Sequence, residues 1–258
     1  MRSEFLKVNV LKFSIISALI SLLIACAGIN NTGAYGEIAE NASARAHTDL
    51  GAAYLQQAKY EIALNEFNRA VAIDPNFAPA FNGLGLVYSS LGEDAKADES
   101  FKKAIQIQPL SSEAHNNYGS FLCGKKRYDE SIPHFLDALK NPLYTTPNLA
   151  YANAGICSVR KNDIKNAEIY LSKALQLDPL THSAAFQLAD IQFKRNEALA
   201  AKSTLQNALI AGQSPDVLWL GIKIERVLGD KDAQASYALL LRQQYPNSEQ
   251  TRLLLSGQ

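Results

Sequence analysis

The sequence predicts an all-α protein that folds as a right-handed superhelical solenoid of about six helical hairpins. Two observations support this prediction. Residue types recur along the chain with a period of 34 residues, which is typical of stacked helical repeats. The 258 residues are also rich in Ala and Leu and include only 14 Gly and 9 Pro, a composition that favours helices. A hydrophobic content of 47% is enough for a sizeable buried core.

The first element, residues 1–25, has the pattern of a lipoprotein signal peptide. A charged segment over residues 1–12 precedes the apolar run FSIISALISLLIA, which is too short for a helix that spans a membrane. The motif Leu23-Ile24-Ala25-Cys26 follows and resembles the bacterial lipobox. That resemblance implies cleavage before Cys26, a diacylglyceryl thioether on its sulfur and a further acyl chain, such as palmitate, on the new amine. The alternative is an ordinary signal peptide with a chance cysteine near its end.

The residues after the lipobox predict where the protein is anchored. Ala27, and not Asp, follows Cys26, and by resemblance to Gram-negative lipoproteins this implies the inner leaflet of the outer membrane, with the chain facing the periplasm. Several acyl chains together give stable anchoring. Residues 26–43 then lack helical apolar periodicity and are rich in Gly and Asn, so we expect a lipidated cysteine followed by a flexible tether.

The repeats begin at about residue 44. Seven positions of the first repeat recur 34 residues later with the same residue types. They are Leu50, Gly51, Tyr54, Ala63, Phe67, Ala70 and Pro75, followed by Leu84, Gly85, Tyr88, Ala97, Phe101, Ala104 and Pro109. This is the tetratricopeptide pattern. Within a domain over residues 44–258, we place repeats at 44–77, 78–111, 112–147, 148–181, 182–215 and 216–247, and a closing helix at 248–256 that Ser248 caps.

Each repeat is expected to form two antiparallel helices that cross at small residues. Gly85 in the first helix and Ala97 in the second lie at such a crossing in repeat two, because only small side chains let the backbones approach. Neighbouring repeats bury the apolar surface that one repeat leaves exposed. A proline near the end of each repeat stops the second helix, because proline disfavours helical geometry in the preceding residue.

The pattern weakens toward the C-terminus. Ser131 replaces the crossing Ala in the third repeat, Ala189 replaces Gly in the fifth, and Lys223 replaces Gly in the sixth. We therefore expect the last repeats to pack less regularly. Pro133 lies inside the second helix of the third repeat, and this predicts a late start or a kink of that helix.

Two cysteines remain after Cys26. Cys123 and Cys157 lie one repeat length apart on the first helices of adjacent repeats. In the oxidising periplasm we expect a disulfide between them. The alternative is two buried free thiols that act as small hydrophobic side chains. Neither cysteine has a Cys or His within three or four residues, and His47 and His115 occupy bulky packing positions, so we expect no metal site.

A concave groove is the predicted binding surface, because the first helices of such repeats line it. Ten residues occupy the groove positions of repeats two to five. They are Asn82, Leu86, Asn116, Asn117, Ser120, Asn153, Ile156, Phe186, Asp190 and Phe193. An Asn side chain both donates to and accepts from a peptide backbone. For Asn117 and Asn153 the alternative remains open that they bond to the neighbouring helix and set the repeat geometry. The set holds no Lys or Arg, which disfavours capture of a free C-terminal carboxylate.

Charge and motifs exclude several classes of function. The chain holds 25 basic and 25 acidic side chains, and without residues 1–25 it holds 22 and 24, a net charge of −2. This balance gives no long-range attraction to nucleic acid. The sequence contains no nucleophile elbow, HExxH motif, Walker loop or paired-carboxylate motif. We therefore expect a protein-binding monomer without catalytic residues, cofactor or small-molecule substrate.

Three segments resemble one family. They read NNYGSFLC over residues 116–123, NPLY over 141–144 and NAGIC over 153–157. With a lipobox and six repeats, they resemble the PilF/PilW family of type IV pilus pilotins. The resemblance implies binding of a secretin subunit and promotion of its outer-membrane localisation and multimerisation. A general periplasmic scaffold for envelope or peptidoglycan machinery is the second reading, and an enzyme with a catalytic cluster in a closed pocket is the third.

Overall fold

The computed structural model describes residues 32–257, which contain thirteen α-helices. In chain order they are α2 (Thr32–Gln56), α3 (Tyr60–Ile73), α4 (Ala78–Leu91), α5 (Asp94–Ile107), α6 (Ser112–Gly124), α7 (Tyr128–Ala138), α8 (Pro147–Arg160), α9 (Ile164–Leu177), α10 (His182–Lys194), α11 (Ala198–Ala211), α12 (Pro215–Leu228), α13 (Lys231–Gln244) and α14 (Glu249–Leu255). Within this range, no helix has the length and apolar character needed to span a membrane. The predicted signal peptide and the lipidation site Cys26 lie outside the described residues.

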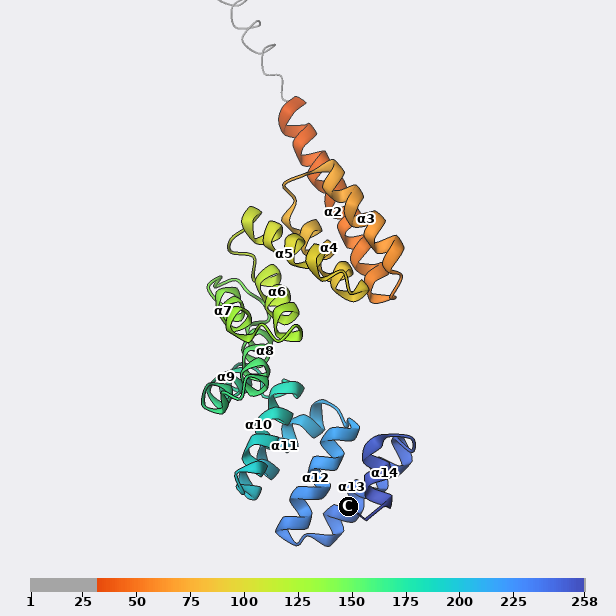
Figure 1. Cartoon of the computed structure of the whole chain (residues 1–258), viewed down its shortest axis with the longest axis vertical. Coiled ribbons are helices and arrows are strands. Elements are labelled where there is room, and N and C mark those ends of the chain that lie inside the picture. Colours follow the sequence, from red (N-terminus) through yellow and green to blue (C-terminus); the bar gives the residue numbers. More distant parts are fainter. Residues whose placement is uncertain (1–31, 258) are drawn as a thin grey trace, which may run out of the picture.

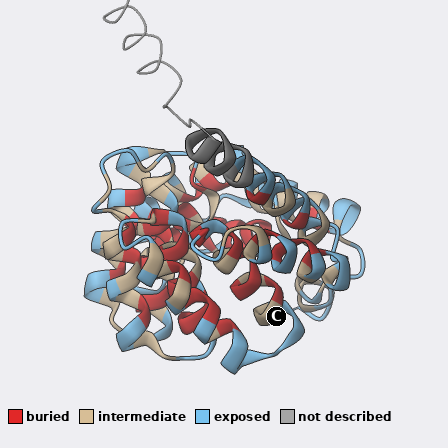
Figure 2. Cartoon of the chain, turned by 90° about the horizontal axis from the view of Figure 1, so that it is seen from above, coloured by how far each residue is buried: buried red, intermediate tan, exposed pale blue. Residues whose placement is uncertain are grey.

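The helices pair into six hairpins that stack into an elongated solenoid (Figure 1). The pairs are α2/α3, α4/α5, α6/α7, α8/α9, α10/α11 and α12/α13, and α14 closes the stack against α12 and α13. Buried residues lie on the helix sides that face other helices, and exposed residues gather in the loops and at the outer edges (Figure 2). The predicted all-α tetratricopeptide solenoid is confirmed. The closing helix begins after Ser248, whose side chain accepts a hydrogen bond from the backbone N–H of Thr251.

Small residues at the helix crossings make this stacking possible. Phe67 of α3 packs against Gly83, and Phe101 of α5 packs against Gly85, so two aromatic rings press on the backbone of α4. A Cβ atom at Gly85 would lie 2.7 Å from the Phe101 ring, closer than real Cβ contacts allow. Both rings are almost fully buried, which removes large apolar surfaces from water. Gly83 and Gly85 therefore let α4 pack closely against α3 on one side and α5 on the other.

The sixth repeat departs from the predicted register. Gly221 of α12 faces the ring of Tyr237 of α13, where a Cβ atom would lie 3.0 Å from the ring. Gly221 and Tyr237 have the same separation as Gly51 and Phe67 in the first repeat. The prediction that Lys223 replaces the crossing glycine is therefore wrong. Gly221 is the small residue that lets the two backbones approach at this crossing. The sequence pattern of the sixth repeat is too weak to show this, and the contact with Tyr237 identifies the position.

Two helix starts also differ from expectation. Helix α2 begins at Thr32, inside the range 26–43 that the sequence predicts to be a flexible tether. Residues 32–43 contain no proline, and an existing helix extends more easily than a new one nucleates, so the first helix continues toward the N-terminus. Helix α7 begins at Tyr128, at the same repeat position as α3 and α5, so the predicted late start is wrong. Pro133 lies within α7.

Candidate functional site

The first helices of the hairpins form the inner surface of the solenoid. Each of α2, α4, α6, α8 and α10 contacts the first helix of the next hairpin. The backbones of the second helices lie farther apart, although Gln206 Nε2 of α11 still donates a hydrogen bond to Tyr237 Oη of α13 at 3.5 Å. The stack is therefore tighter on the side of the first helices and curves toward them. The predicted groove helices α4, α6, α8 and α10 consequently share one concave surface.

All ten predicted groove residues lie on these four helices. Ser120 is exposed and the other nine are half-buried, which leaves polar and apolar atoms accessible along the same surface. Leu86, Asn117 and Ser120 line one cavity of about 370 Å³ between α4 and α6. The neighbouring side chain of Lys125 also lines this cavity. The geometry is that of a groove lined by several repeats, and its use in binding stays a prediction.

An asparagine ladder connects three of the groove helices. Asn117 donates from Nδ2 to Oδ1 of Asn82, at 3.2 Å, and Asn153 donates from Nδ2 to Oδ1 of Asn116, at 3.0 Å. For Asn117 and Asn153 the structure thus shows the contact to the neighbouring helix. An Asn side chain has two N–H donors and an oxygen that accepts two hydrogen bonds. Each amide therefore keeps capacity for a bound backbone while it sets the spacing of the helices.

The C-terminal part of the groove has a different chemistry. Phe186 and Phe193 of α10 pack partly against the core between the fifth and sixth hairpins. The Nζ atom of Lys223 lies 5.5 Å from the ring centroid of Phe193, and Asp190 forms an ion pair with Lys194 at 2.6 Å. The sequence analysis assigned Lys223 to the helix crossing, whereas the structure places its ammonium over the ring of Phe193 and puts Gly221 at the crossing.

A disulfide joins the third and fourth hairpins. Cys123 of α6 and Cys157 of α8 are bonded, with their Cα atoms 5.9 Å apart. Ser131 lies beside this bond, with Oγ 3.3 Å from the Sγ atom of Cys157, and donates to the backbone oxygen of Gly119 at 2.8 Å. The hydroxyl that replaces the crossing Ala is therefore satisfied although it is fully buried. The bond holds α6 and α8, two groove helices, at a set distance.

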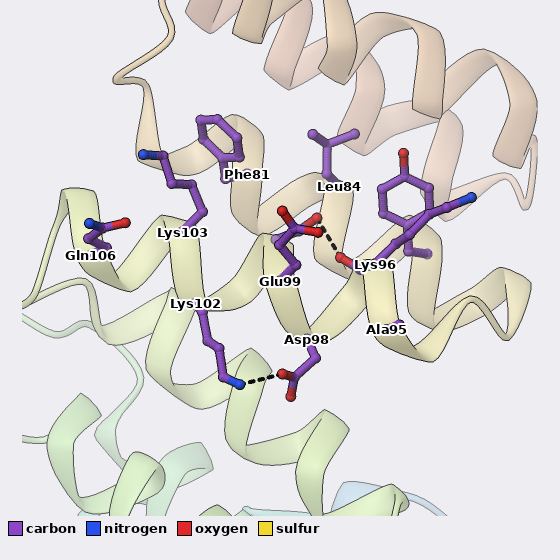
Figure 3. A pocket seen from close by; sticks show the side chains of 11 residues that line it. Phe81, Leu84, Ala95, Lys96, Asp98, Glu99, Lys102, Lys103 and Gln106 are labelled. Carbon is purple, nitrogen blue, oxygen red and sulfur yellow. Dashed lines mark hydrogen bonds and ion pairs between the residues drawn. The ribbon is translucent and has the colours of Figure 1, made fainter.

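A second concavity, which the sequence did not predict, lies beside α5. Its volume is about 1070 Å³, and α4 and α5 provide its walls (Figure 3). Phe81, Leu84 and Tyr88 give an apolar wall from α4. Charged side chains of α5 surround it, among them Lys103 and Glu99. In the sequence, the only sign of this concavity is the charged run DAKADESFKK in α5. Such a run is equally typical of an exposed helix face.

Asp98, at the edge of this concavity, ties the second hairpin to the third. Its carboxylate accepts hydrogen bonds from Tyr118 Oη at 2.8 Å and from Arg127 at 2.7 Å, and it pairs with Lys102. Burial raises the pKa of the Asp98 carboxyl, but the bonds from Lys102, Arg127 and Tyr118 outweigh burial and hold the pKa below its ordinary value. Burial and the bond to Asp98 raise the pKa of Tyr118. At neutral pH the Asp98 carboxyl is therefore ionised, and its bonds to Tyr118 and Arg127 join the second hairpin to the third.

Comparisons with known proteins agree with this architecture. The family model described as "TPR repeat" matches residues 51–92, and the one described as "Tetratricopeptide repeat" matches residues 78–109 and 150–179. An uncharacterised protein of Haemophilus influenzae is 26% identical over 136 residues, which are 53% of this chain and 76% of that protein. The two family models support the repeat assignment.

Two relatives in type IV pilus systems match more of the chain. The type IV pilus assembly protein PilF of Pseudomonas aeruginosa is 34% identical over 204 residues, 79% of this chain and 81% of that protein. A solved structure of Pseudomonas aeruginosa PilF covers 85% of this chain and 100% of its own, with a TM-score of 0.77 and 31% identity. A crystal structure of PilW, described as a widely conserved type IV pilus biogenesis factor, covers 82% of this chain and 98% of its own, with a TM-score of 0.72 and 32% identity. This chain belongs to the tetratricopeptide family of the type IV pilus assembly protein PilF.

Proposed function

We propose that this protein is a pilotin, an outer-membrane lipoprotein that binds secretin subunits in its groove and promotes their outer-membrane localisation and multimerisation. The similarity to PilF over most of both chains is the observation that supports a role in type IV pilus biogenesis. The step from pilus biogenesis to secretin binding rests on the resemblance of the NNYGSFLC segment to the pilotin family and on the chemistry of the groove. We propose no catalytic role.

The groove has the chemistry to bind an extended or helical peptide segment. Leu86 and Ile156 offer apolar contacts, and the asparagine ladder offers donors and acceptors for a backbone. Concave surfaces of stacked repeats use this combination of anchors and backbone contacts to hold peptides. Apart from Asp190, the predicted groove residues are uncharged, so we expect the affinity to depend weakly on salt.

The lipid anchor predicted at Cys26 would place this groove beside the outer membrane, where secretin subunits assemble. Tethering raises the effective concentration of a captured subunit near its site of insertion. A modest intrinsic affinity would therefore be sufficient for assembly.

The experiment compares two serine-to-arginine variants. Ser120 lies on α6 in the groove and Ser236 lies on α13, and each hydroxyl donates to the backbone oxygen four residues earlier, at 2.9 and 2.8 Å. Both serines are exposed, so Ser120→Arg and Ser236→Arg should fold alike. We expect Ser120→Arg to reduce secretin multimers and pili because a long cation obstructs the groove. Ser236→Arg should behave as wild type.

Two results would contradict the proposal at different levels. Normal secretin multimers and pili in a strain that lacks this protein would refute the pilotin function and leave the general periplasmic scaffold. Loss of multimers in the deletion strain, with full rescue by Ser120→Arg and Leu86→Ala, would keep the pilotin function and reject the groove as its binding site. Circular dichroism of each variant shows whether the helices are intact.

A further inference from the structure

Two histidines and an aspartate meet at the third hairpin. His115 lies on α6, and His134 and Asp137 lie one turn apart on α7. The Nδ1 atoms of the two histidines are 3.0 Å apart, and the three potential ligand atoms all lie within 4.8 Å of one another. The three residues form the one such group of His, Cys, Asp and Glu found in the described part of the chain.

The surroundings of His115 orient its ring for metal binding. Its Nε2 atom lies 3.0 Å from the backbone oxygen of Pro109. A carbonyl oxygen only accepts, so Nε2 carries the proton and the lone pair of Nδ1 points toward His134. Histidines that bind metals commonly donate their other ring N–H to a backbone carbonyl in this way. The ring is buried, so the orientation is held by packing as well.

His134 and Asp137 complete the set. Nδ1 of His134 faces Nδ1 of His115 across 3.0 Å, so the two rings present their ligand atoms to the same point. The Tyr118 ring packs against it, with centroids 4.6 Å apart. The side chain of Asp137 is 33% exposed and pairs with Lys140 at 2.6 Å, and its carboxylate lies within 4.8 Å of the ligand atoms of both histidines.

We propose that His115, His134 and Asp137 bind one divalent transition-metal ion, and that Zn²⁺ fits them best. Two imidazole nitrogens and one carboxylate oxygen, with water in the fourth position, are a zinc ligand set that leaves one place open. Two nitrogens bound to a tetrahedral zinc ion are roughly 3.3 Å apart, given Zn–N bonds of about 2.0–2.1 Å. The observed 3.0 Å needs only a small adjustment. Without an ion, the Nδ1–H group of His134 donates a hydrogen bond to Nδ1 of His115. Both Nδ1 atoms therefore have a partner with the ion bound and without it.

This site would brace the helix pair that holds the centre of the groove. An ion would cross-link α6 to α7 next to Pro133, which has no backbone N–H to donate within α7. His115 directly precedes Asn116 and Asn117, the residues that connect three groove helices. The proposal departs from the expectation that the chain holds no metal site, which rested on the surroundings of the cysteines and on His47 and His115 as packing residues. It does not depend on the pilotin function.

Calorimetric titration of ZnCl₂ into the full-length protein, treated with chelator and kept in detergent, tests the site. We expect one ion per chain. His134→Gln and Asp137→Asn should each weaken binding about tenfold or more, because each removes one of three ligands. His182→Gln is the control, because His182 bonds to the backbone oxygen of Ala208 and belongs to no ligand group, so its affinity should equal that of wild type.

A second measurement separates ligand loss from misfolding. Zn²⁺ should raise the melting temperature of wild type and of His182→Gln, and should raise those of His134→Gln and Asp137→Asn clearly less at the same Zn²⁺ concentration, with all variants showing the same helical circular dichroism. Absence of one-to-one binding to wild type would overturn the proposal. Binding of equal affinity in the two ligand variants would also overturn it.

Discussion

At the scale of single residues, close packing at the helix crossings sets stability. A Cβ atom at Gly85 would meet the Phe101 ring at 2.7 Å, and Phe101 is fully buried. Gly85→Leu should therefore force the ring or the helix to move and lower the free energy of unfolding by about 1–3 kcal/mol or more. Urea unfolding followed by circular dichroism measures the change.

Gly124→Leu is the matched control. Gly124 ends α6, and no atom lies within 4 Å of a Cβ atom built there. We expect its free energy of unfolding to stay within about 0.5 kcal/mol of wild type. Equal destabilisation by both leucines would show that the crossing with Phe101 is not the cause, because leucine has a higher helix propensity than glycine at either position.

A second residue, Cys26, is the predicted site of membrane anchoring. The lipobox-like motif that ends in Cys26 predicts thioether lipidation of its sulfur. Cys26→Ser removes the sulfur, so we expect the acyl mass to disappear and the protein to leave the outer-membrane fraction. Mass spectrometry and cell fractionation check both results. A serine variant that still carries acyl chains and sediments with the outer membrane would contradict lipidation at this residue.

At the scale of elements, the Asp98 cluster connects α5 to α6 and to the turn after it. The folded pKa of Asp98 lies below its unfolded value, so its bonds stabilise the fold fully above the ordinary Asp pKa and lose that effect as pH falls through the folded pKa. Asp98→Asn should therefore lower the free energy of unfolding by about 1–2 kcal/mol at neutral pH. The difference between variant and wild type should shrink in acid.

Denaturant unfolding of both proteins at several pH values gives this comparison. Asp163 provides a control, because its lowered pKa comes first from bonds to Asn166 in its own helix turn and not from another hairpin. A neutral-pH difference for Asp98→Asn that persists unchanged in strong acid would show that the carboxylate charge plays no part in joining the hairpins.

At the scale of the whole molecule, the disulfide affects how cooperatively the stack unfolds. Repeats contact only their neighbours, so stability depends on the interfaces between them. Cys123 and Cys157 close a loop with a separation of 34 residues, for which the chain-entropy view gives a stabilisation of about 3–4 kcal/mol. We expect both sulfurs to resist alkylation in denaturant until a reductant is added, and the reduced protein to melt at a lower temperature.

Mass spectrometry after alkylation, with and without reductant, detects the bond. Free alkylation of both thiols in denatured, unreduced protein would reject it. A Cys123→Ser, Cys157→Ser double variant controls for the reductant, because its melting temperature should not change when reductant is added.

The periodic features of the fold were predictable, because the repeat places a small residue at the crossing in most of its copies. Gly51, Gly85 and Phe67 are recognisable from the 34-residue period alone, and so are their helices. The sixth repeat was placed in the wrong register, because its pattern is weak and only the contact of Gly221 with Tyr237 shows the crossing. The start of α2 was also missed, since it depends on extension of a helix beyond the repeat.

The sequence by itself determined the solenoid and the groove face, because a local period dictates which side of each helix faces its neighbours. Only the tertiary structure decided what groove residues do to one another, such as the pairing of Asn117 with Asn82. It also brought His115 to His134, which no motif spacing connects. These contacts depend on how adjacent helices turn relative to each other, and packing across the whole stack sets that rotation.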